Sequence, residues 1–315
     1  MSWRKVANWA KHRPFTLHLA DRLGRSRGRL AILDRLYPSP PAPLKPDFTD
    51  WEKHELAAAW IGHATIVLRI AGMTILTDPV FSARVGVGLG VLTAGPKRLV
   101  APAVKITELP KIDLILLSHA HFDHLDRPTL ARLPKRTPIV TAMRTRDLVT
   151  DLGYRDVKQL DWKRALTIDR LRIEAIEPKH WGARTFHDIQ RSYNAYLLHD
   201  LTTGRKALYG GDTAMTTAFD NRGPVDLAML GIGAYDPYVA AHSNPEQAWE
   251  MFQKIPATFL LPFHHSTFKL SFEPTAEPME RLLKAAGSEA TRVIVREVGG
   301  MWKFNESTKI ILSSS

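Results

Sequence analysis

The chain has 315 residues, of which 44% are hydrophobic, so it is long enough to bury a sizeable core and is not a disordered or fibrous chain. It contains no cysteine, which excludes disulfides, thiolate metal sites and cysteine nucleophiles. The formal net charge is +11, and residues 1–36 hold nine Lys or Arg against two Asp, so seven of the eleven charges lie there.

Residues 1–36 also carry tryptophan, phenylalanine and leucine between the charges, a mixture typical of an interfacial helix on an anionic membrane. The alternative is a helical extension with solvated charges. The segment lacks the apolar run and cleavage site of a secretory signal, and no run in the chain reaches the ~20 apolar residues that span a bilayer. We therefore expect a cytoplasmic protein, with residues 1–36 as a candidate for peripheral contact with the inner face of the membrane.

Five prolines in residues 37–46 block helix and strand continuation and predict an extended linker. This divides the chain into an N-terminal extension with its linker, residues 1–46, and a main domain, residues 47–315. Apolar runs at residues 56–60, 65–70 and 73–77 begin the main domain, and the tight Ala71-Gly72 turn predicts that the last two form a hairpin.

Further strand-like runs alternate with helix-like stretches along the rest of the chain. The strands are expected at residues 113–117, 138–141, 171–176, 193–198, 206–209, 227–230, 258–261 and 292–295. The helices are expected at residues 127–133, 144–152, 245–255 and 276–286. The alternation predicts a mixed α/β domain.

Residues 118–126 read Ser-His-Ala-His-Phe-Asp-His-Leu-Asp and directly follow the apolar run 113–117. Four metal-capable side chains therefore lie within six residues: His119, His121, Asp123 and His124. Imidazole and carboxylate bind borderline divalent metals, and such a cluster beside a core strand is costly to desolvate unless an ion is bound. We interpret these residues as part of a metal site.

Four residues cannot fill two coordination spheres, so further ligands must follow other strands. Three candidates lie where an apolar run opens into a loop: His180 after residues 171–176, Asp212 after 206–209, and His264 after 258–261. Taken singly, His180 could be a surface histidine, Asp212 a turn residue, and His264 a hydrogen-bonded core group.

Taken together, His-x-His-x-Asp-His followed by His, Asp and His resembles the metallo-β-lactamase superfamily. Residues 50–305 are similar to its branch that contains N-acylphosphatidylethanolamine-hydrolysing phospholipase D and the ascorbate-6-phosphate lactonases. The phospholipase side is favoured by Gly-Pro-Lys-Arg (95–98), Gly-Ala-Tyr-Asp-Pro (233–237) and His-x-x-Pro-Glu-x-Ala (242–248). The resemblance implies an α/β fold, the four-layer αββα sandwich with metals at one edge, here preceded by a basic extension.

The resemblance also implies two divalent metal ions, with zinc favoured and manganese or iron as alternatives. One ion would be held by His119, His121 and His180, the other by Asp123, His124 and His264, and Asp212 would bridge them. A rival for His264 is its neighbour His265, and a weaker rival for His180 is His187. His63 and Asp78 are expected behind the ligands, where they would orient them.

Such a centre would attack a phosphodiester with a metal-bridging hydroxide, with Asp212 and Asp123 positioning it. The resemblance implies N-acylphosphatidylethanolamine-like phospholipids as substrates and a phospholipase D-type cleavage. Phe122 and His242 occupy positions that touch the acyl-ethanolamine part in the phospholipase, although Phe122 replaces a tyrosine and so loses a hydrogen bond. Lys97 and Arg98, after the glycine-rich residues 85–94, would suit a phosphate beside a lipid tail; a flexible surface loop is the alternative.

Other function classes remain open. A lactonase or esterase acting on a small phosphorylated metabolite would use the same metals to polarise a carbonyl. A nuclease fits the positive charge, but this charge lies outside the predicted catalytic domain and no RNA-stacking module is evident, so no nucleic-acid partner is expected. A non-catalytic metal-binding regulator is disfavoured because all seven predicted ligands are present. The sequence predicts no oligomeric state.

Overall fold

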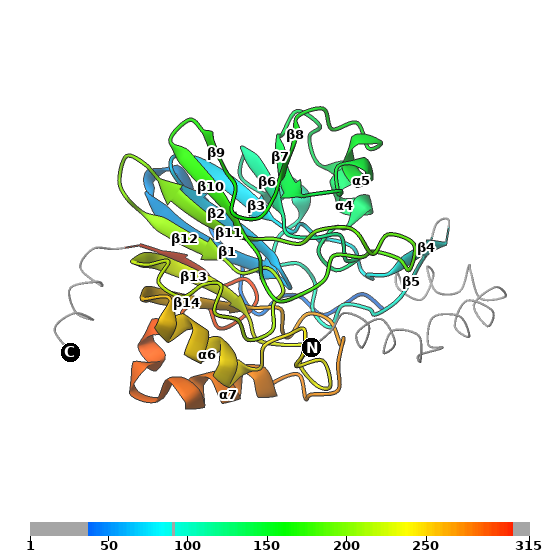
Figure 1. Ribbon diagram of the computed structural model, residues 1–315. Coiled ribbons are helices and arrows are strands. Elements are labelled where there is room, and N and C mark those ends of the chain that lie inside the picture. The colour runs from blue at the N-terminus through cyan, green and yellow to red at the C-terminus, as the bar shows by residue number, and fades with distance from the viewer. Residues whose placement is uncertain (1–36, 90–91, 305–315) are drawn as a thin grey trace.

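The computed structural model describes residues 37–89 and 92–304, and two β-sheets packed face to face form its centre (Figure 1). Helices cover the outer face of each sheet, so the chain forms the expected αββα sandwich. The predicted basic segment, residues 1–36, lies outside the described residues.

The first sheet has seven strands in the order β15-β1-β2-β3-β6-β7-β8. Their bounds are β1 (Leu56–Gly62), β2 (Thr65–Ile70), β3 (Met73–Thr77), β6 (Leu114–Leu117), β7 (Ile139–Ala142), β8 (Val157–Leu160) and β15 (Met301–Lys303). β2 and β3 form the predicted hairpin, with Ile70 opposite Met73 across the turn. From β3 to β8 the neighbouring strands are parallel.

The second sheet has six strands in the order β14-β13-β12-β11-β10-β9. Their bounds are β9 (Ala165–Ile168), β10 (Leu171–Ile176), β11 (Ala195–Asp200), β12 (Lys206–Tyr209), β13 (Val225–Gly231) and β14 (Ala257–Phe263). β12, β13 and β14 are parallel, whereas β9 to β12 pair antiparallel. A separate hairpin joins β4 (Val87–Leu89) and β5 (Leu92–Ala94).

Strand β1 shows why the layers stack. All seven of its residues are buried, and because alternate side chains of a strand point to opposite faces, the strand contributes to two cores. Trp60 packs between the sheets with residues such as Tyr196 and Met229. Ile61 packs on the other face with Leu130 and other residues of the outer layer. A strand buried on both faces reads as a continuous apolar run, as it does here.

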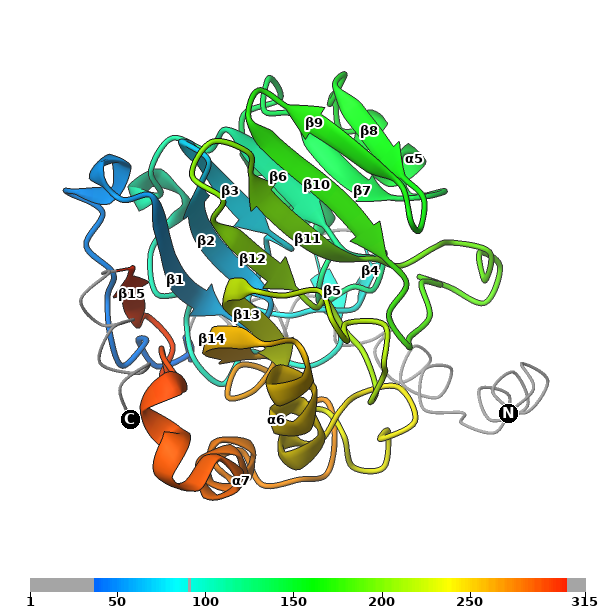
Figure 2. The same cartoon turned by 60° about the vertical axis from the view of Figure 1, so that its left-hand side comes forward.

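The helices cover the outer faces of the two sheets (Figures 1 and 2). Two short helices, α4 (Arg127–Arg132) and α5 (Asp147–Thr150), pack on the first sheet through Leu130 and Val149. The longer pair, α6 (Pro245–Lys254) and α7 (Glu277–Ala286), packs on the second sheet. Short 3₁₀ helices are η1 (Trp51–Lys53), η2 (Ile106–Glu108) and η3 (Gly287–Arg292).

The sequence prediction was wrong in some local details. Residues 292–295 do not form a strand, because η3 ends at Arg292 and Val293 makes only an isolated bridge with Leu260. Residues 144–152 form only the single turn of α5, and the strands β8, β9 and β15 were not predicted.

The proline-rich residues 37–46 contain no helix or strand, and they run along the domain. Ser39 Oγ donates to the carbonyl of Arg98, and the Leu44 amide donates to the carbonyl of Val298. Within residues 37–89 and 92–304, no helix has the length and apolar character needed to cross a bilayer.

Candidate metal centre

The candidate residues come together because strands of both sheets end at one edge of the sandwich. β6 leads into the loop with His119, His121, Asp123 and His124. In the second sheet, His180 follows β10, Asp212 follows β12, and His264 follows β14 directly. Two more residues come from the first sheet: His63 lies in the β1–β2 turn and Asp78 directly follows β3.

The first ligand group consists of His119, His121, His180 and Asp212. His121 Nδ1 lies 2.8 Å from His119 Nε2 and 3.3 Å from His180 Nε2. Asp212 Oδ2 lies 3.8 Å from His119 Nε2 and 3.7 Å from His180 Nε2. The loop after β6 and the segment after β10 therefore bring three imidazoles to one carboxylate.

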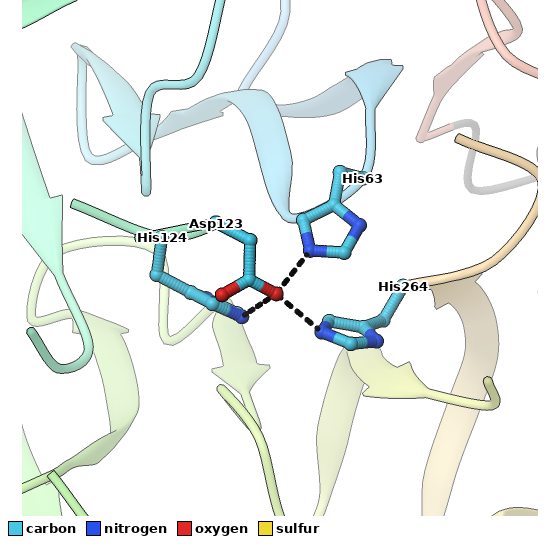
Figure 3. A group of neighbouring side chains, drawn as sticks. All are labelled: His63, Asp123, His124 and His264. Carbon is cyan, nitrogen blue, oxygen red and sulfur yellow. Dashed lines mark hydrogen bonds and ion pairs between the residues drawn. The ribbon is translucent and has the colours of Figure 1, made fainter. Parts of the chain in front are cut away.

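The second group consists of His63, Asp123, His124 and His264 (Figure 3). Asp123 Oδ2 is its centre, at 2.9 Å from His63 Nε2, 3.4 Å from His264 Nε2 and 3.7 Å from His124 Nε2. Asp212 reaches this group as well, because its Oδ2 lies 3.1 Å from His124 Nε2 and 3.3 Å from His264 Nε2. One carboxylate oxygen thus lies between the two groups.

The two groups fit divalent cations. Ligands bound at ~2.0–2.1 Å to one tetrahedral ion lie roughly 3.3 Å apart, close to most of these distances. Two buried nitrogens that face the groups, His124 Nε2 and His264 Nε2, also have no hydrogen-bond partner, and neither has the buried Asp212 Oδ1. Buried polar atoms are normally satisfied, so their lack of partners supports a bound cation. The donor set contains only imidazole and carboxylate, which suits zinc, manganese or iron.

Hydrogen bonds fix the ring orientation of three of the histidines. His124 Nδ1 donates to Asp78 Oδ2 at 2.7 Å, and His180 Nδ1 donates to the carbonyl of Ala241 at 3.0 Å. His119 Nδ1 donates to Ser118 Oγ at 2.8 Å. Each ring can then present the lone pair of Nε2 to a bound metal, which is the usual arrangement of metal-binding histidines.

Asp78 connects these contacts beneath the centre. Its Oδ2 accepts hydrogen bonds from Ser118 Oγ, His124 Nδ1 and the Tyr209 hydroxyl, the last at 2.6 Å. Tyr209 belongs to β12, so this carboxylate joins the two sheets directly under the site. Asp78 was predicted to lie behind the ligands, whereas Ser118 and Tyr209 were not predicted there, because their contacts depend on how the sheets stack.

Burial and neighbouring charges set the protonation states. Burial lowers the pKa of His63 to about 3 and the pKa of His121 to about 4, so both rings are neutral at pH 7. Burial would also lower the pKa of His264, but Asp212 and Asp123 raise it to about 9. Without a metal, His264 is therefore positively charged beside these carboxylates, and metal binding must displace its proton.

His63 lies beside the candidate ligand Asp123. It was predicted to orient ligands, and its Nε2 lies 2.9 Å from Asp123 Oδ2, closer than the ring nitrogens of His264 and His124. The turn that places it is unusual, because Gly62 has φ 131° and His63 itself has φ 54°. Such left-handed conformations are costly for a residue other than glycine and are often found at functional sites.

The two rival histidines are not in either group. His265 points to the other side of its turn, where its ring packs on Trp60 with centroids 4.6 Å apart and Nδ1 lies 2.9 Å from Ser266 Oγ. His187 is exposed, seven residues beyond His180. The geometry therefore favours His264 and His180 as the candidates.

The proposed substrate contacts lie beside the two groups. His242 Nδ1 is 3.8 Å from Asp212 Oδ2, and its side chain is 13% exposed. Phe122 is partly buried and packs with Val80, Val85 and Phe268.

The expectation that Lys97 and Arg98 form a phosphate site is wrong for Arg98. This side chain is buried and donates to the carbonyls of Val80 and Ser82. The Lys97 ammonium also donates to a carbonyl, that of Tyr37. The Arg98 guanidinium therefore holds the loop after β3 instead of facing a ligand.

Comparisons with known proteins show which family the chain resembles. Residues 73–265 match the family described as the Beta-lactamase superfamily domain. An uncharacterized protein of Mycobacterium tuberculosis is 33% identical over 271 residues, covering 82% of this chain and 72% of that protein. N-acyl-phosphatidylethanolamine-hydrolyzing phospholipase D 1 of Caenorhabditis elegans is 26% identical, covering 80% of this chain and 76% of that enzyme.

The fold also matches that of solved structures. An isothiocyanate hydrolase from Delia radicum gut bacteria superposes with a TM-score of 0.65 at 20% identity, covering 79% of this chain and 99% of the other. At this level of identity the similarity concerns the fold.

Proposed function

The chain belongs to the metallo-β-lactamase superfamily, in its N-acylphosphatidylethanolamine-hydrolysing phospholipase D-like branch, and we propose that it is a two-metal phosphodiesterase. The observation that carries this proposal is the position of Asp212, whose Oδ2 lies within 3.8 Å of ring nitrogens from both groups. A carboxylate shared by two ligand groups is suited to a pair of ions, and paired ions are suited to phosphoryl oxygens.

The ligand roles in this proposal follow the two groups. His119, His121 and His180 would hold one ion, Asp123, His124 and His264 the other, and Asp212 would contact both. When bound, two zinc ions would supply a hydroxide at neutral pH and neutralise charge on the phosphoryl group. Asp212 and Asp123 are fixed by buried histidines on several sides, so they would keep the reacting groups aligned without moving. Asp78 would orient His124, and His63 would orient Asp123.

Similarity to the worm phospholipase supports a lipid phosphodiester as the substrate class. We therefore propose phospholipase D-type cleavage of N-acylphosphatidylethanolamine-like phospholipids, which releases phosphatidic acid. His242 would contact the headgroup, because its ring lies beside Asp212 and its side chain is 13% exposed. Burial lowers its pKa to about 4, so the ring is neutral and can donate or accept a hydrogen bond. Phe122 would give an apolar contact beside it.

A substrate panel tests the proposal. Purified protein of known metal content is incubated with N-acylphosphatidylethanolamine, with phosphatidylethanolamine and with a phosphorylated sugar lactone. The expected result is release of phosphatidic acid from the first lipid. Opening of the lactone without lipid cleavage would contradict the proposal and favour a lactonase, and bound metal without turnover of any substrate would favour a metal-binding regulator.

Residues 1–36 are proposed to hold the protein on the inner face of the cytoplasmic membrane, because they combine seven net positive charges with aromatic and leucine side chains. Co-sedimentation with anionic liposomes tests this, using the full chain and a chain without residues 1–36, which keeps the contacts of residues 37–46 with the domain. Loss of binding in the shortened chain is expected, whereas equal binding of both chains would contradict this role.

A further inference from the structure

Arg184 belongs to neither ligand group, but it contacts the loop after β6 that carries four candidate ligands (residues 119–125, the ligand loop). It lies in the segment after β10, four residues beyond His180, and its side chain crosses to the loop after β6. Its Nη1 donates to the carbonyl of Ala120 and to the carbonyl of Leu125, each at 2.8 Å. Its guanidinium carbon lies 4.0 Å from the centroid of the Phe122 ring.

These three contacts cover the whole ligand loop. Ala120 directly follows His119, Leu125 directly follows His124, and Phe122 lies between them. Arg184 therefore holds both ends of the loop with one nitrogen and its middle with the face of the guanidinium. Among the described residues no carboxylate forms an ion pair with Arg184, so these carbonyls and the ring are its principal partners.

The backbone around Arg184 is itself fixed. Gly182 passes so close to the next part of the chain that an added Cβ would lie 2.4 Å from the carbonyl oxygen of Ser192. Further along, Arg191 forms ion pairs with Asp147 and Asp188. The segment is thus anchored on both sides of Arg184. Because its backbone is fixed, the Arg184 side chain can hold the ligand loop in one position.

We propose that Arg184 is a positioning residue that sets the distance between the two segments supplying the histidines of the first ligand group. His119 and His121 come from the loop that Arg184 holds, and His180 comes from its own segment. The inference rests on the proposed two-metal centre. The second group takes Asp123 and His124 from the same loop, but its other two members, His63 and His264, directly follow β1 and β14, so a smaller share of this group depends on Arg184.

Guanidinium chemistry fits this task better than an ammonium group. A planar guanidinium can stack on an aromatic ring while its N–H groups donate in the plane, whereas lysine offers a compact charge on a flexible stem. Arg184→Lys should therefore retain part of the effect and Arg184→Met should lose it. Residues that orient metal ligands typically change metal affinity by ~10–100-fold.

The test is a zinc titration against a chromophoric chelator, together with the visible spectrum of the cobalt-substituted protein. In Arg184→Met we expect one of the two ions to bind ~10–100-fold more weakly, with a changed cobalt spectrum, while the other ion is weakened less. Arg184→Lys should fall between this variant and the wild type. If Arg184→Met does not fold, Arg184→Lys and Phe122→Leu are compared with the wild type in the same titration, because each of them changes the contact between Arg184 and the loop.

Arg127→Met is the matched control. Arg127 begins α4, donates to the carbonyl of Leu148 and pairs with Asp151, without contacting residues 119–125. Its loss should leave both affinities unchanged. Unchanged affinities in Arg184→Met, or equal losses in Arg184→Met and Arg127→Met, would overturn the inference. A wild-type chain that holds no metal would instead refute the two-metal centre itself.

Discussion

At the residue scale, one carboxylate oxygen contacts several histidine rings at once. Asp123 Oδ2 and Asp212 Oδ2 each lie within 3.8 Å of at least three ring nitrogens. Burial alone would raise the pKa of Asp212, but the imidazoles of His124 and His264 hold it well below the usual carboxyl range. The carboxylate is therefore ionised before any metal arrives, and it supplies the negative charge that attracts cations.

Replacement of this shared carboxylate is the most direct test at a single position. Asp212→Asn keeps the size of the side chain and one oxygen but removes the charge between the groups. We expect phosphodiesterase activity to fall to background, with fewer than two metals per chain, because both groups lose a common ligand. Elemental analysis and the lipid assay measure this, and wild-type turnover in Asp212→Asn would exclude the mechanism.

Tyr209 provides a second test, since its hydroxyl supports Asp78 from the opposite sheet. In Tyr209→Phe, Asp78 loses one of its donors and holds His124 less firmly, so metal affinity should fall by ~10-fold. Stability should also fall by about 1 kcal/mol.

Tyr196→Phe is the control for this substitution. Tyr196 is also buried, but its hydroxyl donates to the carbonyl of Leu117 and does not contact Asp78. It should show a similar loss of stability and unchanged metal binding in denaturation and chelator titrations. Equal metal affinity in the two variants would show that Tyr209 has no role at the centre.

Much of the candidate site could be predicted from the sequence, because ligands that follow apolar strands are visible as local patterns. His119, His180, Asp212 and His264 all fit this description. The approach of His63 to Asp123 could not be predicted, since it depends on a left-handed turn and on the alignment of β1 with the ligand loop. The Arg184 contacts likewise join residues about 60 positions apart.

At the element scale, α6 fixes the position of His242. Its N-cap, Asn244, accepts a hydrogen bond from the Gln247 amide at 2.9 Å, and the Gln247 side chain accepts one from the Asn244 amide. Ser243 donates to the carbonyls of Thr213 and Gly231, which anchors the chain just after His242. The residue proposed to touch the substrate therefore directly precedes a well-anchored helix start.

Removal of the cap should weaken this helix start. Asn244→Ala loses the acceptor for the Gln247 amide, so we expect a loss of about 1 kcal/mol in the free energy of unfolding. Asn244→Asp retains an acceptor and should stay near the wild type. Chemical denaturation measures both, and equal stability of Asn244→Ala and the wild type would show that the cap contributes nothing.

Elements with long apolar runs were predicted well, and those with weak or ambiguous patterns were not. β8 has only two buried residues, at its ends, and β9 has none, so neither shows a clear apolar run. Residues 292–295 were predicted as a strand because Val293, Ile294 and Val295 are β-branched. Val293 is buried against β14, but the chain makes only one bridge there, so burial without strand pairing explains its apolar character.

At the scale of the whole molecule, three separate hydrophobic cores hold the four layers together. One lies between the sheets, and one lies under each pair of helices. The centre sits at the edge of these layers and takes ligands from strands of both sheets, so metal binding would tie the sheets together. The three cores consist of apolar side chains and contain none of the candidate ligands, so we expect the fold to persist without the metals.

Metal removal should therefore lower stability without unfolding the protein. A ligand that binds only the folded state stabilises it by about 4 kcal/mol at a free concentration a thousand times its Kd, which corresponds to roughly 10 °C in Tm for a large domain. Treatment with a chelator should leave the far-ultraviolet circular dichroism spectrum unchanged and lower Tm by about that amount, and added zinc should restore it. Asp212→Asn should show a smaller shift on chelation, since it lacks the ligand common to both groups. An unchanged Tm after chelation of protein shown to contain two metals per chain would mean that the ions do not join the sheets.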